Sequence, residues 1–246
     1  MIRPIMINAA MEDVEMNILK EHLGNLTKVE DKICTFYEGC LDGYPVILCS
    51  TSEGLINAAV STSVGINKYN PIAVIVQGVA GGHGFDIHKS DIIISSDVIN
   101  INSVKTSIRK IGEGVDTTKW EHLNFKHGRK ELVPVKADET LIKIAQQVGE
   151  NYTKKNVILG RIGSGDIWNR EADRILMFNN KFGTLCEDME SFAVLQVAEK
   201  YDIPSISIRI ISNNEVNSEI YDRNLGYDCQ RFVIDFVKEY IKGISK

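Results

Sequence analysis

The sequence contains no long apolar run and no histidine or cysteine pattern that is typical of a metal site. No stretch approaches the ~20 apolar residues that a membrane helix needs, so we expect no contact with a membrane. The first residues turn acidic at Glu12, too early for a signal-peptide core and its cleavage site. The five histidines form no HExxH motif. We therefore predict neither a bound metal nor a cofactor.

The chain has few cysteines and no net positive charge. The five cysteines are odd in number and form no CxxC pair, which indicates reduced thiols and a cytoplasmic location. The formal net charge of −5 argues against nucleic acid as a partner, because phosphate binding needs a basic face. A length of 246 residues, with 43% hydrophobic and 25% charged residues, is typical of one globular α/β domain spanning 1–246.

Short apolar runs alternate with helical patterns along most of the chain. The expected strands are 5–9, 33–39, 44–50, 72–76, 91–95, 157–162 and 205–212. The expected helices are 11–23, 52–64, 138–152, 171–178 and 226–244. Asp42-Gly43 is a hairpin signal between two of the strands, so we expect a mixed sheet rather than a purely parallel one.

The stretch 184–214 carries the densest charge next to apolar sequence. Glu187, Asp188 and Glu190 surround Met189, and a helix that is apolar nearly all round follows them. The next strand carries Arg209 among isoleucines. Buried charges are rare without a partner or a ligand, so this segment predicts either a structural ion pair or a ligand site.

Two further segments are candidates for function. The glycine-rich segment 77–84 follows a strand and either lets the backbone approach a ligand or forms a tight turn. It matches neither the P-loop nor the dinucleotide-binding fingerprint. The polar segment 97–135 is predicted to be a long loop. Structureless loops of this length are uncommon, so we expect it to be functional or to contact a partner.

Six short motifs occur in the order found in one known superfamily. They are AMEDVE (10–15), GLINAA (54–59), QGVAGGHGFDIHKSDIIIS (77–95), SGDIWN (164–169), EDME (187–190) and RIISN (209–213). Together they resemble the nucleoside phosphorylase/nucleosidase superfamily, and within it the methylthioadenosine/S-adenosylhomocysteine nucleosidases. The resemblance implies an α/β fold, a three-layer α/β/α sandwich whose mixed central sheet is partly barrel-like.

The chemistry that the resemblance implies is hydrolysis of the N9–C1′ bond of methylthioadenosine, S-adenosylhomocysteine or a close relative, through an oxocarbenium-like transition state. Glu190 matches the carboxylate that holds the ribose hydroxyls, and Met189 the residue that packs on the sugar. An amino-terminal glutamate activates the water in this family. Glu15 fits that role best, although strict spacing places Val14 there, and Glu12 is the alternative.

The remaining roles also come from the resemblance. Arg209 matches the arginine that helps to hold the nucleophile, and Trp168 an aromatic residue near the purine. The other positions that match the substrate pocket are Val79, Ala80, Gly81 and Ser212. Val79 replaces a serine that would help to hold water, and Glu53 replaces an apolar residue of the 5′ pocket. Gln77 stands where phosphorylases carry an arginine, which favours hydrolysis over phosphorolysis.

The catalytic acid of the family is an aspartate, and this chain has Asn213 in its place. An amide cannot give a proton to the purine. Three consequences remain open: the substrate is a 6-oxopurine nucleoside, Glu215 supplies the acid, or the chain binds a nucleoside without cleaving it. A purine nucleoside phosphorylase is the other alternative.

The resemblance also implies a homodimer in which a partner loop closes the 5′ side of the pocket. The segment 97–135, with Trp120 and Phe125, is the candidate loop.

Overall fold

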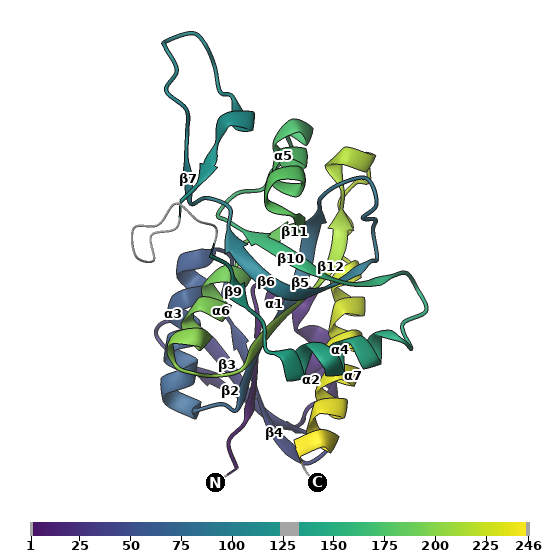
Figure 1. Ribbon diagram of the computed structural model, residues 1–246. Coiled ribbons are helices and arrows are strands. Elements are labelled where there is room, and N and C mark those ends of the chain that lie inside the picture. The colour runs from purple at the N-terminus through teal and green to yellow at the C-terminus, as the bar shows by residue number, and fades with distance from the viewer. Residues whose placement is uncertain (1, 124–132, 245–246) are drawn as a thin grey trace.

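The computed structural model describes residues 2–123 and 133–244 and places a large mixed sheet between two groups of helices (Figure 1). The ten-stranded sheet follows the order β11-β10-β6-β12-β5-β1-β4-β3-β2, with β9 beside β6. Its strands are β1 Ile5–Ala9, β2 Gly24–Glu30, β3 Thr35–Leu41, β4 Tyr44–Ser50, β5 Ala73–Gly82, β6 Ile92–Asn100, β9 Val135–Lys136, β10 Val157–Ser164, β11 Thr184–Asp188 and β12 Ser205–Asn213. The predicted fold class, a sandwich with a mixed sheet, is confirmed.

Part of the sheet closes on itself. Strand β11 pairs with β10 in parallel and with β5 in antiparallel orientation, so that β5, β12, β6, β10 and β11 form a barrel. Strand β12 lies in the wall of this barrel, between β5 and β6, and every one of its residues is buried. A closed barrel leaves side chains of one face in its interior and those of the other face against the helices. The charged residues of β11 and β12 are therefore enclosed.

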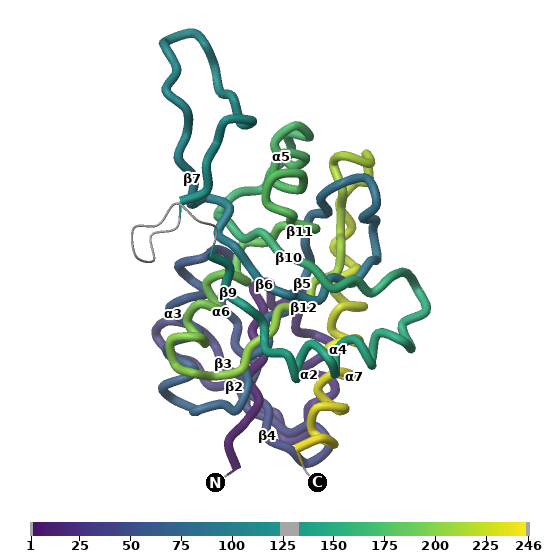
Figure 2. Tube along the Cα trace, in the orientation of Figure 1, coloured from purple at the N-terminus to yellow at the C-terminus, as the bar shows by residue number. Residues whose placement is uncertain are grey.

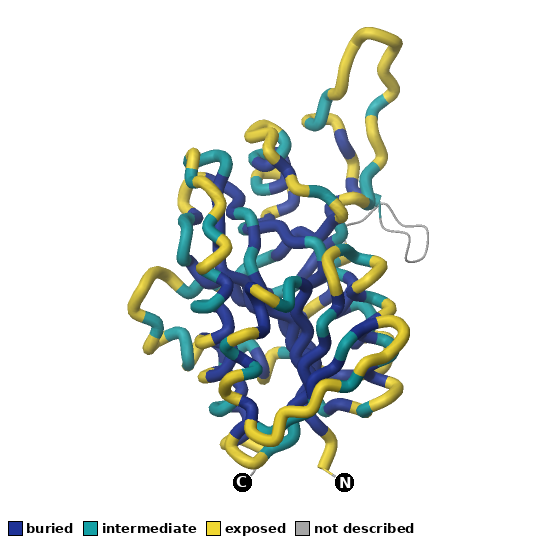
Figure 3. The backbone as a smooth tube through the Cα atoms, turned by 180° about the vertical axis from the view of Figure 1, so that it is seen from behind, coloured by how far each residue is buried: buried dark blue, intermediate teal, exposed yellow. Residues whose placement is uncertain are grey.

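Helices cover the sheet on two sides. Helix α3 (Leu55–Tyr69) packs with α6 (Ser191–Lys200) on one side, and α7 (Leu225–Ile244) packs with α4 (Glu139–Gly149) and α2 (Asn17–His22) on the other. Helix α5 (Ala172–Phe182) lies beyond the end of β11. The buried residues, dark blue in Figure 3, follow the sheet through the centre of the molecule. None of the helices in the described ranges has the length and apolarity that a membrane crossing requires.

The predicted helix 11–23 is wrong as a single element. The structure has α1 (Glu12–Glu15) and α2, which are separated at Met16. The Gln230 side chain interrupts the helical ladder, because its amide oxygen accepts from the N–H groups of Ile18 and Leu19 at 2.8 and 3.2 Å. Its nitrogen donates to the carbonyl of Val14 at 2.7 Å. A side chain inserted into the i→i−4 bonds is a known cause of helix breaks.

The glycine-rich segment is strand rather than turn as far as Gly82. Strand β5 continues from Ala73 through Gly82, so the tight-turn interpretation is wrong. Hydrogen bonding to β12 on one side and to β1, then β11, on the other keeps this backbone extended despite its glycines. The backbone can thus approach a ligand from within a sheet.

The segment 97–135 is less irregular than predicted. Strand β6 extends to Asn100, and the short strands β7 (Val104–Lys105) and β8 (Glu121–His122) form a hairpin whose arm projects away from the body (Figure 2). A short 3-10 helix, η1 (Thr117–Lys119), lies in this arm. Trp120 is buried, and Phe125 lies outside the described residues. The strands β2, β7, β8, β9 and β11 are not among the predicted ones.

Candidate active site

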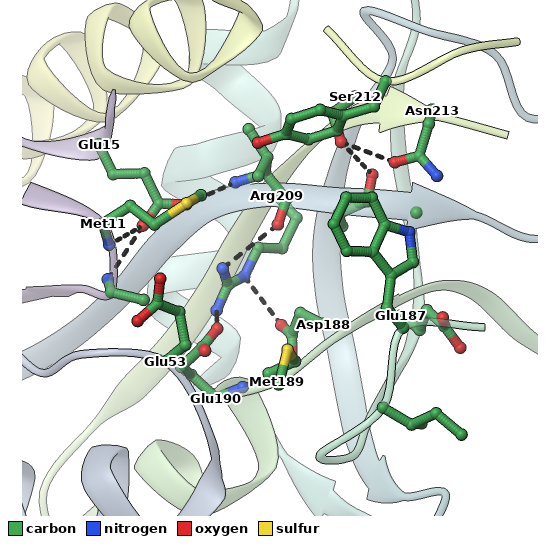
Figure 4. A pocket seen from close by; sticks show the side chains of 17 residues that line it. Met11, Glu15, Glu53, Glu187, Asp188, Met189, Glu190, Arg209, Ser212 and Asn213 are labelled. Carbon is green, nitrogen blue, oxygen red and sulfur yellow. Dashed lines mark hydrogen bonds and ion pairs between the residues drawn. The ribbon is translucent and has the colours of Figure 1, made fainter. Parts of the chain in front are cut away.

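A cavity opens where the strands β1, β5, β11 and β12 end. Its volume of ≈ 230 Å³ far exceeds the ~10–15 Å³ that one water needs, so it has room for a ligand of many atoms. All predicted site residues except Glu12 line it. They are Glu15, Glu53, Val79, Ala80, Gly81, Trp168, Met189, Glu190, Arg209, Ser212 and Asn213. Residues separated by almost the whole chain thus meet in one place (Figure 4).

Glu15 provides a carboxylate with a fixed orientation. One oxygen accepts hydrogen bonds from the backbone N–H groups of Ala10 at 2.9 Å and Met11 at 3.0 Å. The other accepts from the N–H of Val79 at 2.9 Å. Gly78 makes this approach possible, because a β-carbon there would lie 2.1 Å from Glu15 Oε1 and 2.8 Å from a nitrogen of Arg209. The break between α1 and α2 and the bare backbone of β5 together place the carboxylate.

The Glu15 carboxylate is basic for its type. Burial raises its pKa, and the charge of Arg209 and the three N–H donors oppose that rise only in part. A carboxylate whose pKa is raised is better suited to accept a proton from water. Its position in the cavity wall leaves it able to do so.

Arg209 holds the centre of the site. Its side chain is 1% exposed and lies 2.8 Å from an Asp188 oxygen and 3.3 Å from a Glu190 oxygen. Asp188 is in turn fixed by the hydroxyl of Ser164 at 2.5 Å and by the N–H of Ser191 at 3.0 Å. The segment thus forms a buried ion pair and also part of a cavity wall, and a ligand site there stays a prediction.

Glu190 joins the ion pair to the cavity. One of its oxygens contacts Arg209, and the other accepts from the N–H of Gly54 at 3.0 Å. Burial, together with the charges of Asp188 and Glu15, raises the pKa of Glu190 to about 7, although Arg209 acts in the opposite direction. Met189 lies beside it on the wall, an apolar surface next to a hydrogen-bond acceptor.

These pKa shifts predict a loss of activity in acid. If Glu15 and Glu190 act as carboxylates, the value of kcat/KM falls as the pH drops through about 7, where Glu190 takes up its proton. We expect a slope of about tenfold per pH unit below that point. Measuring kcat/KM between pH 5 and pH 9 for the nucleoside cleavage that the resemblance implies checks this, and a value of kcat/KM that stays constant down to pH 5 would contradict it.

The far end of the cavity carries polar and aromatic groups. The Ser212 hydroxyl lies 2.9 Å from Asn213 Oδ1, which leaves the amide nitrogen without a partner among the described residues. Trp168 is 59% exposed, so it is not a core residue, and its ring contacts that of Tyr221 edge to face with centroids 5.4 Å apart. A flat ring entering here would meet an aromatic surface and one amide donor.

Three residues that the sequence analysis considered for a role in the site do not line the cavity. Glu12 points away from the cavity and contacts Lys20 and the hydroxyl of Tyr37. Glu215 is absent from the cavity wall and lies 3.8 Å from Arg170. Gln77 is fully buried, and its nitrogen donates to the Glu15 carbonyl at 2.6 Å. Neither Glu12 nor Glu215 is therefore placed to reach a ligand in this cavity.

Several lining residues were missed. Met11 and Ile167 line the cavity and lie within the motifs AMEDVE and SGDIWN, whereas Tyr221 lines it from outside any motif. Glu187 and Asp188 were noticed as charges but given no role. A strand at 184–188 would have revealed that alternate residues of this acidic run face opposite sides.

Comparison with known proteins gives consistent matches. Residues 4–242 match the profile of the phosphorylase superfamily. A 5′-methylthioadenosine/S-adenosylhomocysteine nucleosidase of Bacillus cereus (strain G9842) is 32% identical over 212 residues, which are 85% of each chain. The nucleosidase of Neisseria meningitidis, solved with methylthio-immucillin-A, is similar with a TM-score of 0.79 and 24% identity over 96% of this chain and 99% of that one. A futalosine hydrolase mutant of Helicobacter pylori has a TM-score of 0.78 and 17% identity, over 97% of this chain and 100% of that one.

Proposed function

Because this chain belongs to the phosphorylase superfamily, and within it to the family of the methylthioadenosine/S-adenosylhomocysteine nucleosidases, we propose that it hydrolyses the N9–C1′ bond of a purine nucleoside. The observation that carries the proposal is the single cavity in which Glu15, Glu190, Met189 and Arg209 meet. The substrates named for the relatives, methylthioadenosine and S-adenosylhomocysteine, are the first candidates for this chain.

Every step of the reaction except protonation of the leaving base has a residue suited to it. The ribose lies on Met189, with its hydroxyls donating to Glu190. Glu15 takes a proton from water as the water oxygen bonds to C1′. The electrons of the N9–C1′ bond pass to the purine, which takes its proton from solvent, because the Asn213 amide can hydrogen-bond to the base but cannot give up a proton. The products are a free base and a ribose derivative.

Hydrolysis is favoured over phosphorolysis by the charges at the site. Arg209 is already paired with Asp188 and Glu190, and Gln77 is buried on the Glu15 carbonyl. The described cavity wall carries five carboxylates, and its arginine is already paired. Phosphate bound there would therefore be close to negative charge and would find no unpaired cation on that wall. A bound anion needs donors or positive charge near it.

The test is a panel of nucleosides assayed with and without phosphate. Adenosine, inosine, guanosine, methylthioadenosine and S-adenosylhomocysteine are each incubated with the protein, and free base and ribose 1-phosphate are quantified. We expect base release that does not depend on phosphate. Ribose 1-phosphate as the product would show a phosphorylase instead, and tight binding without release of any base would show a nucleoside-binding protein.

We also propose that the protein is a cytoplasmic homodimer. The five cysteines carry free thiols, which suits a reducing compartment. The hairpin arm carries the exposed apolar side chains Ile108, Ile111 and Val115, which a second subunit would cover. Sedimentation of the purified protein should give the mass of two chains, and the mass of one chain would rule the dimer out.

A further inference from the structure

Glu187 and Asn213 lie on either side of Gly81 at the end of the barrel. Strand β11 pairs Glu187 with Gly81, and strand β12 pairs Asn213 with the same glycine. A β-carbon on Gly81 would lie 3.7 Å from Cγ of Glu187 and 3.6 Å from Nδ2 of Asn213. Both side chains therefore border the space that this glycine leaves open. Figure 4 shows them at the end of the cavity opposite Glu15, Glu53 and Glu190.

Glu187 is a hydrogen-bond acceptor in a fixed position. Its Oε1 accepts from the backbone N–H of Asn169 at 2.9 Å, and its Oε2 contacts the Asn169 side-chain nitrogen and Nε2 of His83, the latter at 3.2 Å. His83 is itself held by the Thr184 hydroxyl at 2.8 Å. A carboxylate has about four acceptor sites, so these three contacts leave Oε1 able to accept one more donor.

Glu187 is also ionised at neutral pH. Burial alone would raise its pKa, but the hydrogen bond with His83 and the two donors of Asn169 hold the pKa below its usual value. An ionised carboxylate accepts hydrogen bonds and donates none. Glu187 is therefore unsuited to replace the acid that the site lacks, and it is suited to recognise a donor.

Purine bases differ at the edge that would face these two residues. Hypoxanthine and guanine present acceptors at O6 and N7 and a donor at N1–H, whereas adenine presents a donor at its 6-amino group and an acceptor at N1. Adenine N1 opposite a carboxylate would bring two acceptors together. A buried acceptor left without its donor discriminates strongly between otherwise similar ligands.

We infer that Glu187 selects nucleosides of 6-oxopurines by accepting a hydrogen bond from N1–H, while the amide nitrogen of Asn213 donates to O6 or N7. This inference rests on the proposed function, because it requires the purine to lie over Gly81. It differs from the substrates named for the relatives, whose base is adenine. It also gives a role to the asparagine that replaces the usual acid.

The test compares bases on identical sugars. We expect kcat/KM for inosine to exceed that for adenosine by about 100-fold or more, and the same order for 5′-methylthioinosine over 5′-methylthioadenosine. In Glu187→Gln the amide presents both a donor and an acceptor, so the preference should fall to about tenfold or less. The matched control is Glu53→Gln at the opposite end of the cavity, which should leave the ratio between the two bases unchanged whatever it does to the rates.

Binding to the unmodified protein provides a measurement that needs no variant. Calorimetry with free hypoxanthine and free adenine should show tighter binding of hypoxanthine. Equal or faster release from adenosine would overturn the selection by Glu187 and leave the proposed function standing. If no nucleoside releases its base, the proposed function fails, and tighter binding of adenine than of hypoxanthine would then overturn the selection independently.

Discussion

Replacing Glu15 by glutamine is expected to lower kcat for base release by about 10²–10⁴-fold, the usual contribution of a general base. The amide cannot accept a proton from water, and the side chain keeps its size. Glu15 is buried and accepts from three backbone N–H groups, so we expect the glutamine side chain to lie in nearly the same place. The NH2 group of the glutamine would then face at least one of these backbone N–H donors. Steady-state rates on the most active nucleoside of the panel measure the loss.

Glu12→Gln is the matched control for that experiment. Glu12 is three residues away in the sequence, yet it contacts Lys20 and Tyr37 rather than the cavity. We expect its turnover to stay within a few-fold of that of the unmodified protein. If Glu12→Gln were the inactive variant and Glu15→Gln the active one, the assignment of the base would be reversed.

Replacing Arg209 by methionine is expected to lower the free energy of unfolding by about 3–5 kcal/mol, because it leaves buried carboxylates without their cation. Asp188 and Glu190 both lose a charged partner at 2.8 and 3.3 Å, and their own side chains are only 1% and 6% exposed. Methionine fills part of the volume, so the effect is mainly electrostatic. Denaturant titration at pH 7, with the midpoint and slope compared between proteins, measures it.

Arg161→Met serves as the comparison, because Arg161 also lies in a strand and pairs with an aspartate, Asp97. That pair is partly exposed, with 25% and 16% of the two side chains accessible. Its loss should lower the stability by only about 1 kcal/mol. An Arg209 variant that is no less stable than the Arg161 variant would show that the buried cluster does not depend on its arginine.

Much of the fold could be predicted from local sequence, whereas most of the candidate site residues came from the resemblance to a known family. The alternation of isoleucine with polar residues in 205–212 gives β12, and the arginine within it was recognised as a buried charge. What failed depends on contacts between distant segments. The break at Met16 requires the side chain of Gln230, which lies more than 200 positions away in the sequence.

The acidic run 187–190 shows the same limit within the site. Its charges are evident in the sequence, but their division of roles depends on the pairing of β11 with two different strands. That pairing directs Asp188 toward Arg209 and leaves Glu187 beside Gly81. No spacing rule along the chain carries this information, because it arises only when the barrel closes.

The closed barrel also bears on how tightly a base can be held. Both Glu187 and Asn213 are paired with β5 at Gly81, and Glu187 is also paired with Gly163 of β10, so the sheet holds both residues at that point. Their side chains are positioned during folding, and little conformational freedom remains to be lost when a ligand arrives. Preorganisation of this kind raises affinity by reducing the entropy lost on association, and it penalises any base whose donors and acceptors are displaced from the fixed ones.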